Sequence, residues 1–321
     1  MVNKTTVTGF VLLGFASLRE LQILLTVVFL SIYLVVLMGN LLLILAVAHN
    51  LHLHSPMYFL FVNLSIVDAC YISTTVPKSI VNSLMDSKQI SFSGCVTQVF
   101  LVNLCAGGEL YFLTAMAYNH YAAICHPLRY QLIMNWNVCF QTAAACWVTS
   151  VTMAMAYTLN TFSLHFCQSN VIEQYFCDIP QLLKIPCTDT ATAQIFVFAS
   201  TLSLGSFCSI IIFVSYVYIF SAVFKIQSAQ AQQKAFSTCT PHLTIFCLFI
   251  FTASFSYLRP KTLLSPIVDL LAAVLYTVLP PIMNPIIYGL RNKDIQLALA
   301  RALTNFPCIS CVSLEEMDWK H

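Results

Sequence analysis

Charged residues are scarce in this chain. Only 8% of its 321 residues are Asp, Glu, Lys or Arg, whereas a soluble globular domain carries about 25%. So few charges cannot cover a folded surface in water, which excludes an ordinary cytosolic enzyme. The formal net charge of +2 gives no support for nucleic-acid binding. Because 59% of the residues are apolar, we expect the chain in a lipid bilayer.

Seven apolar stretches are long enough to cross a membrane, which takes about 20 residues. A bilayer admits only helices and closed barrels, and the short alternating segments of a barrel are missing. We therefore expect an all-α bundle of seven transmembrane helices, with neither a cleavable signal peptide nor the internal repeat of many transporters. The expected spans are 23–48, 57–84, 95–126, 139–162, 194–222, 236–258 and 267–289.

The orientation of the bundle does not follow from its basic residues, because Lys and Arg divide equally between the two sides. Asn3 opens an N-glycosylation sequon, Asn-Lys-Thr, which is useful only in the lumen. We therefore expect an extracellular N-terminus over residues 1–22, a seven-helix domain over 23–289 and a cytoplasmic tail over 290–321.

Four cysteines fall on the expected outer side. Cys167, Cys177 and Cys187 lie ten residues apart between the fourth and fifth spans, and Cys95 opens the third span. In an oxidising compartment such a set predicts two disulfides. The spacing does not fix which cysteines pair.

Acids and amides occur deep inside the apolar spans, where they are costly and usually functional. Asp68 lies in the second span, Glu109 in the third, Asn40 in the first and Asn284 in the seventh. No Lys or Arg lies at that depth. The two carboxyl groups therefore either hold protons or share a cation such as sodium. The alternative to a functional role is that the two carboxyl groups are protonated, hydrogen-bonded and only structural.

Five motifs follow one another along the chain and carry a family resemblance. They are Leu53–Leu60 (LHSPMYFL), Met116–Tyr130 (MAYNHYAAICHPLRY), Ser215–Tyr216, Lys234–Leu243 (KAFSTCTPHL) and Pro281–Lys293 (PIMNPIIYGLRNK). Together they resemble the odorant receptors, which are rhodopsin-like G-protein-coupled receptors. The resemblance implies a multi-pass protein of the plasma membrane. It also implies that a small volatile odorant binds and that a heterotrimeric G protein of the stimulatory olfactory type raises cyclic AMP.

The resemblance also assigns residues. It implies that Cys95 pairs with Cys177 and leaves Cys167 with Cys187, although a pairing of Cys95 with Cys187 stays open. Asp68, Glu109 and Asn284 would line the family's sodium or water site; no other metal or cofactor is expected. The residues of the inner switch would be Asn119, His120, Tyr121, Tyr216, Pro285 and Tyr288.

Asn119 and His120 depart from the family pattern, which has Asp-Arg-Tyr where this chain has Asn-His-Tyr. Histidine is shorter than arginine, only partly charged near neutral pH and without the five-donor fork. We expect a receptor that folds but couples weakly or differently. Loss of the ionic pair could instead raise basal activity, and a receptor-shaped protein without signalling is a further alternative.

The ligand pocket of this fold lies among the outer halves of the third, fifth, sixth and seventh helices. The seventh helix contains no lysine, so retinal could not be attached there. The position where amine receptors have an aspartate is Val102, so a cationic amine would lack a counter-ion. A neutral, largely apolar ligand therefore fits best. Helical spacing predicts that the pocket is lined by Val102, Asn103, Ala106, Gly107, Leu110, Ser200, Thr201, Leu204, Ile250, Ala253, Ser254, Tyr257, Val274 and Thr277.

The tail predicts a short amphipathic eighth helix over Asn292–Leu303, lying on the inner leaflet. Cys308 and Cys311 follow it as candidates for palmitoylation, with free thiols as the alternative.

Two other classes of function are weaker. A cation transporter or channel could use Asp68 and Glu109, but no further polar stripe continues the path. An enzyme would need catalytic or metal-binding groups, and the inner histidines His49, His52 and His54 have no acidic partner at metal spacing.

Overall fold

The computed structural model describes residues 8–13, 19–85, 87–167, 170–258, 266–289 and 295–297. The predicted glycosylation site at Asn3 and the palmitoylation candidates Cys308 and Cys311 lie outside the described residues. So do the side chains of Tyr257 and Tyr288.

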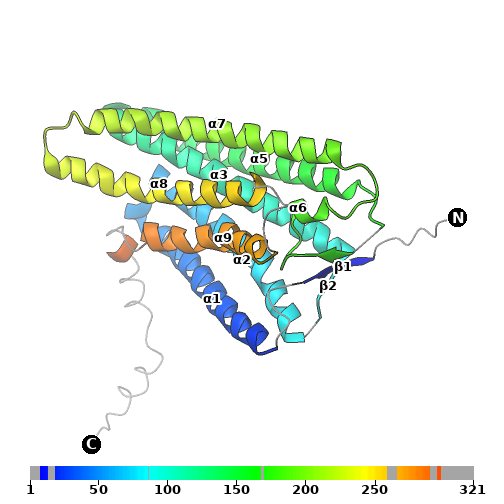
Figure 1. Cartoon of the computed structure of the whole chain (residues 1–321). Helices are drawn as coiled ribbons and strands as arrows, with labels where there is room; N and C mark the ends of the chain where they lie inside the picture. Colours follow the sequence, from blue (N-terminus) through cyan, green and yellow to red (C-terminus); the bar gives the residue numbers. More distant parts are fainter. Residues whose placement is uncertain are drawn as a thin grey trace, which may run out of the picture.

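Seven of the described helices are long and apolar enough to cross a membrane, and they run side by side as one bundle (Figure 1). This confirms the expected seven-helix membrane fold. The helices are α1 (Arg19–His49), α2 (Pro56–Met85), α3 (Phe92–Cys125), α5 (Trp136–Phe162), α7 (Ala191–Val223), α8 (Ala229–Leu258) and α9 (Pro266–Asn284).

The helices begin earlier than hydropathy predicts, and the difference is largest for α8. This helix starts at Ala229 rather than at residue 236, because its first residues are Ala, Gln and Lys, which favour helix without being apolar. Capping defines two other starts. Ser91 accepts a hydrogen bond from the backbone N–H of Gly94 at the start of α3, and Asn135 does so from Val138 at the start of α5.

Helix α3 occupies the middle of the bundle and contacts α2, α5, α7 and α8. On its other side α2 packs against α1 and α9. Large apolar side chains of α2 and α3, such as Leu64, Phe112 and Met116, are fully buried in the largest core cluster. Apolar side chains on the outside, such as Phe213 of α7, which is 70% exposed, suit contact with lipid.

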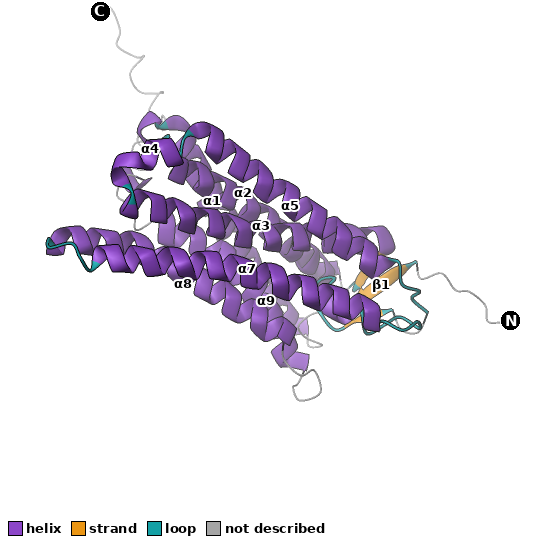
Figure 2. Ribbon diagram, turned by 90° about the horizontal axis from the view of Figure 1, so that it is seen from above, coloured by secondary structure: helices purple, strands orange, loops and turns teal. Residues whose placement is uncertain are grey.

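A small sheet closes the outer end of the bundle, where the predicted fold had no strands. Its strands are β1 (Gly9–Leu12), β2 (Gln89–Ser91) and β3 (Val171–Ile172). β1 lies in the middle, antiparallel to β2 and parallel to β3. Strands of two to four residues depend on partners far away in the chain, and periodicity within one segment cannot predict them. Figure 2 shows β1 at the end of the bundle opposite α4.

Short turns complete the ends. They are the 3-10 turns Leu51–Leu53 and Pro127–Arg129, the helices α4 (Tyr130–Ile133) and α6 (Ile179–Leu182), and the π-turn Pro285–Gly289 after α9. Of the predicted eighth helix only residues 295–297 are described; they are helical, and Ile295 is fully buried in the core cluster.

Candidate functional site

Two disulfides hold the long outer loop between α5 and α7. One joins Cys95 of α3 to Cys177, with their Cα atoms 5.6 Å apart, and the other joins Cys167 to Cys187 within the loop. This is the pairing that the family resemblance implies, and Cys95 is not joined to Cys187.

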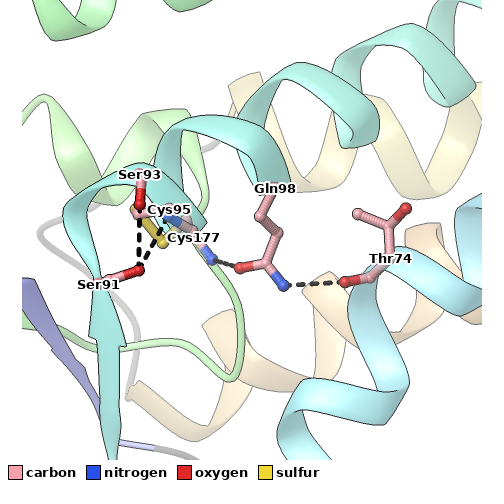
Figure 3. The surroundings of a disulfide bond; sticks show 7 residues. Thr74, Ser91, Ser93, Cys95, Gln98 and Cys177 are labelled. Carbon is pink, nitrogen blue, oxygen red and sulfur yellow. Dashed lines mark hydrogen bonds between the residues drawn. A yellow bond between two sulfur atoms is a disulfide. The ribbon is translucent and has the colours of Figure 1, made fainter.

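Gln98 fixes the same loop to two helices (Figure 3). Its side-chain oxygen accepts a hydrogen bond of 2.8 Å from the backbone N–H of Cys177, and its amide nitrogen donates to the carbonyl of Thr74 on α2 at 2.9 Å. A buried amide with both ends satisfied holds its neighbours in one arrangement. Gln98 gives no signal in the sequence, because its partners come from two distant segments.

The loop then enters the bundle. Tyr175 is buried and packs against Phe29 of α1. It also hydrogen-bonds Thr277 of α9, and because the Thr277 hydroxyl donates to Ala273, Tyr175 is the donor. Burial raises the pKa of Tyr175, so its O–H stays protonated. Phe176 packs against Tyr276 of α9. The outer loop therefore contacts α9 through both Tyr175 and Phe176.

The predicted pocket residues of α3 divide between faces. Val102 is buried in the core, and the Asn103 amide donates to the carbonyl of Val99 in its own helix. A Cβ on Gly107 would lie 3.9 Å from Ser150 Oγ, so Gly107 is on the side of α3 that faces α5.

On the other helices, the hydroxyl of Thr201 is hydrogen-bonded to Tyr157 of α5, and Ser200 donates to the carbonyl of Phe196 in its own helix. Thr277 is fully buried beneath Tyr175. The remaining described members of the predicted pocket are half-buried: Ala106, Leu110, Leu204, Ile250, Ala253, Ser254 and Val274.

The polar residues of the spans come together in the middle of the bundle. Asn284 donates to both carboxylate oxygens of Asp68, at 3.0 and 2.8 Å, and to Glu109 at 3.5 Å. All three side chains are buried. The structure thus assembles the predicted trio from α2, α3 and α9. Among the described residues no group of three or more His, Cys, Asp or Glu could hold a metal ion. The trio contains two carboxyl groups and one amide.

Asn40 of α1 serves a different purpose from the trio. Its amide donates to the carbonyls of Val36 and Pro281, at 3.0 and 3.3 Å. Pro285 has no N–H to offer the carbonyl four residues before it, and that carbonyl belongs to Pro281. Asn40 therefore satisfies the backbone acceptor that Pro285 leaves open. A Cβ on the adjacent Gly39 would lie 3.2 Å from the Pro285 ring, which shows how closely α1 approaches the π-turn after α9.

At the inner end, His120 is buried against a second histidine. The rings of His120 and His242 of α8 meet edge to face at 5.5 Å. His242 bonds the hydroxyl of Tyr216 at 3.0 Å through Nδ1 and the carbonyl of Leu113 at 2.8 Å through Nε2. Because a carbonyl only accepts, Nε2 carries the proton and Tyr216 donates to Nδ1. His120 Nε2 has no hydrogen-bond partner among the described residues.

Asn119 and Tyr121 face the loop between α3 and α5. Asn119 accepts a hydrogen bond of 2.9 Å from the hydroxyl of Tyr130 on α4. Burial raises the pKa of Tyr130, which keeps it a donor. The Tyr121 hydroxyl lies 3.0 Å from His126 Nε2. Tyr130 and His242 lie within the sequence motifs, but the motifs predict no role for either.

Among known protein families, the one described as olfactory receptor matches residues 29–306 of this chain. The chain belongs to it. Olfactory receptor 14A2 of Homo sapiens is 46% identical over 94% of this chain and 96% of the relative. Olfactory receptor 14A16 of Homo sapiens is 47% identical over 93% of this chain and 96% of the relative.

Membership in the olfactory receptor family confirms the resemblance carried by the motifs. The chain is a multi-pass protein of the plasma membrane and a G-protein-coupled receptor, not an enzyme. The predicted inner switch nevertheless has His120 where the family resemblance leads one to expect arginine.

Proposed function

We propose that this olfactory receptor binds a small, volatile, largely neutral odorant in the outer half of the bundle and activates a stimulatory G protein that raises cyclic AMP. The observation that carries the proposal is a series of polar contacts between the two ends. Tyr175 of the outer loop holds Thr277 on α9. Two turns further along α9, Asn284 holds Asp68 and Glu109.

The series continues along α3 to the inner end. Glu109 lies one turn before Leu113. The Leu113 carbonyl accepts a hydrogen bond from His242, and His242 in turn accepts one from the hydroxyl of Tyr216. A ligand that binds one arrangement of the outer end more tightly would shift the population of this whole framework. No covalent chemistry is required, and the prolines of α9 supply a hinge for such a rearrangement.

The predicted pocket residues favour a neutral ligand. They are apolar side chains with a few hydroxyls and one amide, and none carries a charge. A cationic amine would find Val102 where it needs a counter-ion. An apolar wall with a few polar groups is typical of small-molecule sites.

We further propose that Asp68, Glu109 and Asn284 hold a sodium ion. The donor set fits, because hard cations prefer carboxylate and amide oxygens. Glu109 Oε2 and Asn284 Oδ1 are buried and have no hydrogen-bond partner among the described residues. A bound sodium ion would balance the negative charge of one of the two carboxyl groups, with neither of which any lysine or arginine of the described chain pairs.

The sodium proposal is tested by thermal unfolding of the purified receptor in sodium chloride and in choline chloride. We expect a higher Tm in sodium, and the difference should vanish in Asp68→Asn. The exposed Glu20 of α1 offers the control, because Glu20→Gln should keep the difference. Equal Tm values of the wild type in the two salts would contradict the proposal.

Weak coupling to the G protein is the second candidate, and the structure of the inner switch favours it. Asn119 is bonded to Tyr130, and His120 lies against His242 rather than beside an acid. The switch therefore lacks the permanent cation that arginine would supply.

The main proposal is tested by cyclic-AMP responses to a panel of volatile compounds, with surface expression measured in the same cells. We expect at least one neutral odorant to raise cyclic AMP, and deletion of the stimulatory G protein should abolish the rise. A ligand-gated cation current that persists after this deletion would point instead to a channel.

A further inference from the structure

The inward face of α7 becomes more open over a short stretch of its outer half. On this face Val197 and Cys208 are buried, with 7% and 3% of their surface exposed. Thr201 and Leu204 lie between them at helical spacing and so on the same side of the helix, yet Thr201 is exposed and Leu204 only half-buried. Beside Leu204, a Cβ on Gly205 would have no other atom within 4 Å. We call the open space along Thr201, Leu204 and Gly205 the α7 hollow.

Helices α3 and α5 close the outer end of the α7 hollow. The two helices contact each other and α7, and Val99 of α3, Tyr157 of α5 and Val197 of α7 belong to one buried cluster. Both α3 and α7 run from the outer to the inner end. One turn beyond Val99 is Asn103, which is half-buried, and one turn beyond Val197 is Thr201. The buried cluster is therefore the roof of the α7 hollow, and Asn103 and Thr201 lie directly beneath it.

Two hydroxyl groups meet beneath this roof. The Tyr157 hydroxyl lies 3.3 Å from Thr201 Oγ1. The pair has two protons, and the hydrogen bond between the two oxygens uses only one of them. Within the described part of the chain neither oxygen has a further partner, and Thr201 does not donate to its own helix as Ser200 does to the Phe196 carbonyl. One O–H of the pair is thus left without an acceptor.

We propose that Tyr157, which the sequence does not predict as a pocket residue, selects the odorant by its oxygen. Together with Thr201 it donates a hydrogen bond to the carbonyl group of an aliphatic ketone or aldehyde. This rests on the proposed function, because it names the class of ligand for the same site. A carbonyl oxygen only accepts hydrogen bonds, so it satisfies the remaining O–H and brings no donor that needs a partner of its own. The hydrocarbon part of the ligand then lies in the α7 hollow beside Leu204 and Gly205.

A site with an unpaired donor discriminates against ligands that lack an acceptor. A hydrocarbon of the same shape would exclude water from the free O–H and offer no acceptor in its place, which leaves a buried polar group unsatisfied. Sites built to hydrogen-bond a ligand therefore reject the analogue without the polar group more strongly than an apolar wall can. The hydrogen bond between Tyr157 and Thr201 also fixes the point at which the carbonyl oxygen binds.

The test measures binding as the thermal stabilisation of the full-length receptor in lipid nanodiscs. The probes are volatile aliphatic ketones and aldehydes of increasing chain length. Each is compared with the alkene in which a methylene group replaces the carbonyl oxygen, so that shape is kept and the acceptor is lost. We expect at least one carbonyl compound to raise the Tm, and its matched alkene to raise it less at the same concentration.

Tyr157→Phe keeps the ring and removes the hydroxyl, and the Thr201 hydroxyl can then donate to the Val197 carbonyl of its own helix. The apparent Kd of the carbonyl compound should rise about three- to tenfold, as the loss of one hydrogen bond predicts, whereas that of the alkene should not rise. Tyr33 offers the matched control, because its hydroxyl lies at the same distance of 3.3 Å from the hydroxyl of Ser73 between α1 and α2. Tyr33→Phe should leave both Kd values unchanged.

Cyclic AMP measured with the same compounds distinguishes this proposal from the proposed function. Binding of a carbonyl compound without a rise in cyclic AMP would contradict coupling to the stimulatory G protein and still support the ligand class. The ligand class is overturned if no carbonyl compound binds, if carbonyl compounds and alkenes bind equally, or if Tyr157→Phe weakens both members of a pair alike. A matched alcohol that binds as tightly as the ketone would overturn the choice of a carbonyl group.

Discussion

Asn284 joins three helices in the middle of the bundle. Its amide is the donor to Asp68 and also reaches Glu109, so two helices are held to α9 through one side chain. Buried carboxyl groups are costly unless they are hydrogen-bonded.

We therefore expect Asn284→Ala to lower the free energy of unfolding by about 1–3 kcal/mol, because the variant leaves buried acceptors without a donor. Thermal unfolding of the purified receptor measures the change. Asn137, which is exposed near the start of α5, supplies the matched control, since Asn137→Ala should change little. Equal losses in the two variants would show that Asn284 has no special role.

Single residues show what sequence can and cannot predict. The cost of polar groups in lipid singles out Asp68, Glu109 and Asn284 from sequence alone, and the structure brings them together. Gln98 and Tyr175 give no such signal, because a polar residue near a helix end and a tyrosine in a loop are ordinary. Their importance comes from partners that lie far away in the chain, on α2 and α9.

Among the helices, α1 supplies a hydrogen bond that the end of α9 lacks. Pro285 leaves the carbonyl of Pro281 without its helical donor, and Asn40 of α1 donates to that carbonyl instead. Hydropathy predicts both helices correctly but cannot show that one supplies the hydrogen bond the other lacks.

The hydrogen bond from Asn40 to the Pro281 carbonyl predicts that substitutions of Asn40 and Pro285 have non-additive effects on stability. Asn40→Ala should cost about 1–3 kcal/mol of stability, because a buried carbonyl loses its partner. In a Pro285→Ala background the same substitution should cost less, since the alanine backbone then offers an N–H of its own to the Pro281 carbonyl. A double-mutant cycle of thermal stabilities measures the coupling. Additive effects would mean that Asn40 and Pro285 act independently.

The ends of helices and the short strands are predicted less well from the sequence than the helices themselves. The length of the apolar stretches predicts each of the seven described transmembrane helices, yet it places the start of α8 at residue 236 and misses its polar first turns, which begin at Ala229. The strands β1 to β3 stay invisible, because each is too short to show alternation and forms only where the folded chain brings the three segments together.

For the whole molecule, the outer end depends on covalent links of different length. The Cys95–Cys177 disulfide joins residues 82 apart and ties the loop to α3, whereas Cys167 and Cys187 are 20 apart. Constraint of the unfolded chain grows with the length of the closed loop, to about 4.5 kcal/mol for the longer loop and about 3.3 kcal/mol for the shorter.

We therefore expect the double substitution Cys95→Ser, Cys177→Ser to reduce folded receptor at the cell surface more than Cys167→Ser, Cys187→Ser does. Flow cytometry of an N-terminal epitope, normalised to total protein, gives the comparison. A greater loss from the shorter link would contradict the entropic argument and point to a specific role of the loop.

Asn119 and His120 lie in the inner switch that we propose for signal transfer, where this receptor departs from the Asp-Arg-Tyr pattern that the family resemblance implies. The buried His120 packs on His242 and offers no permanent cation. We therefore expect coupling to the G protein to be weakened while ligand binding is retained.

The most direct measurement is the cyclic-AMP response of the wild type and of the double variant Asn119→Asp, His120→Arg to the same odorants at matched surface expression. We expect a larger maximal response in the variant, at a similar odorant concentration for half-maximal effect. An equal response of the two proteins would contradict it, because coupling would then not depend on the cation that His120 lacks.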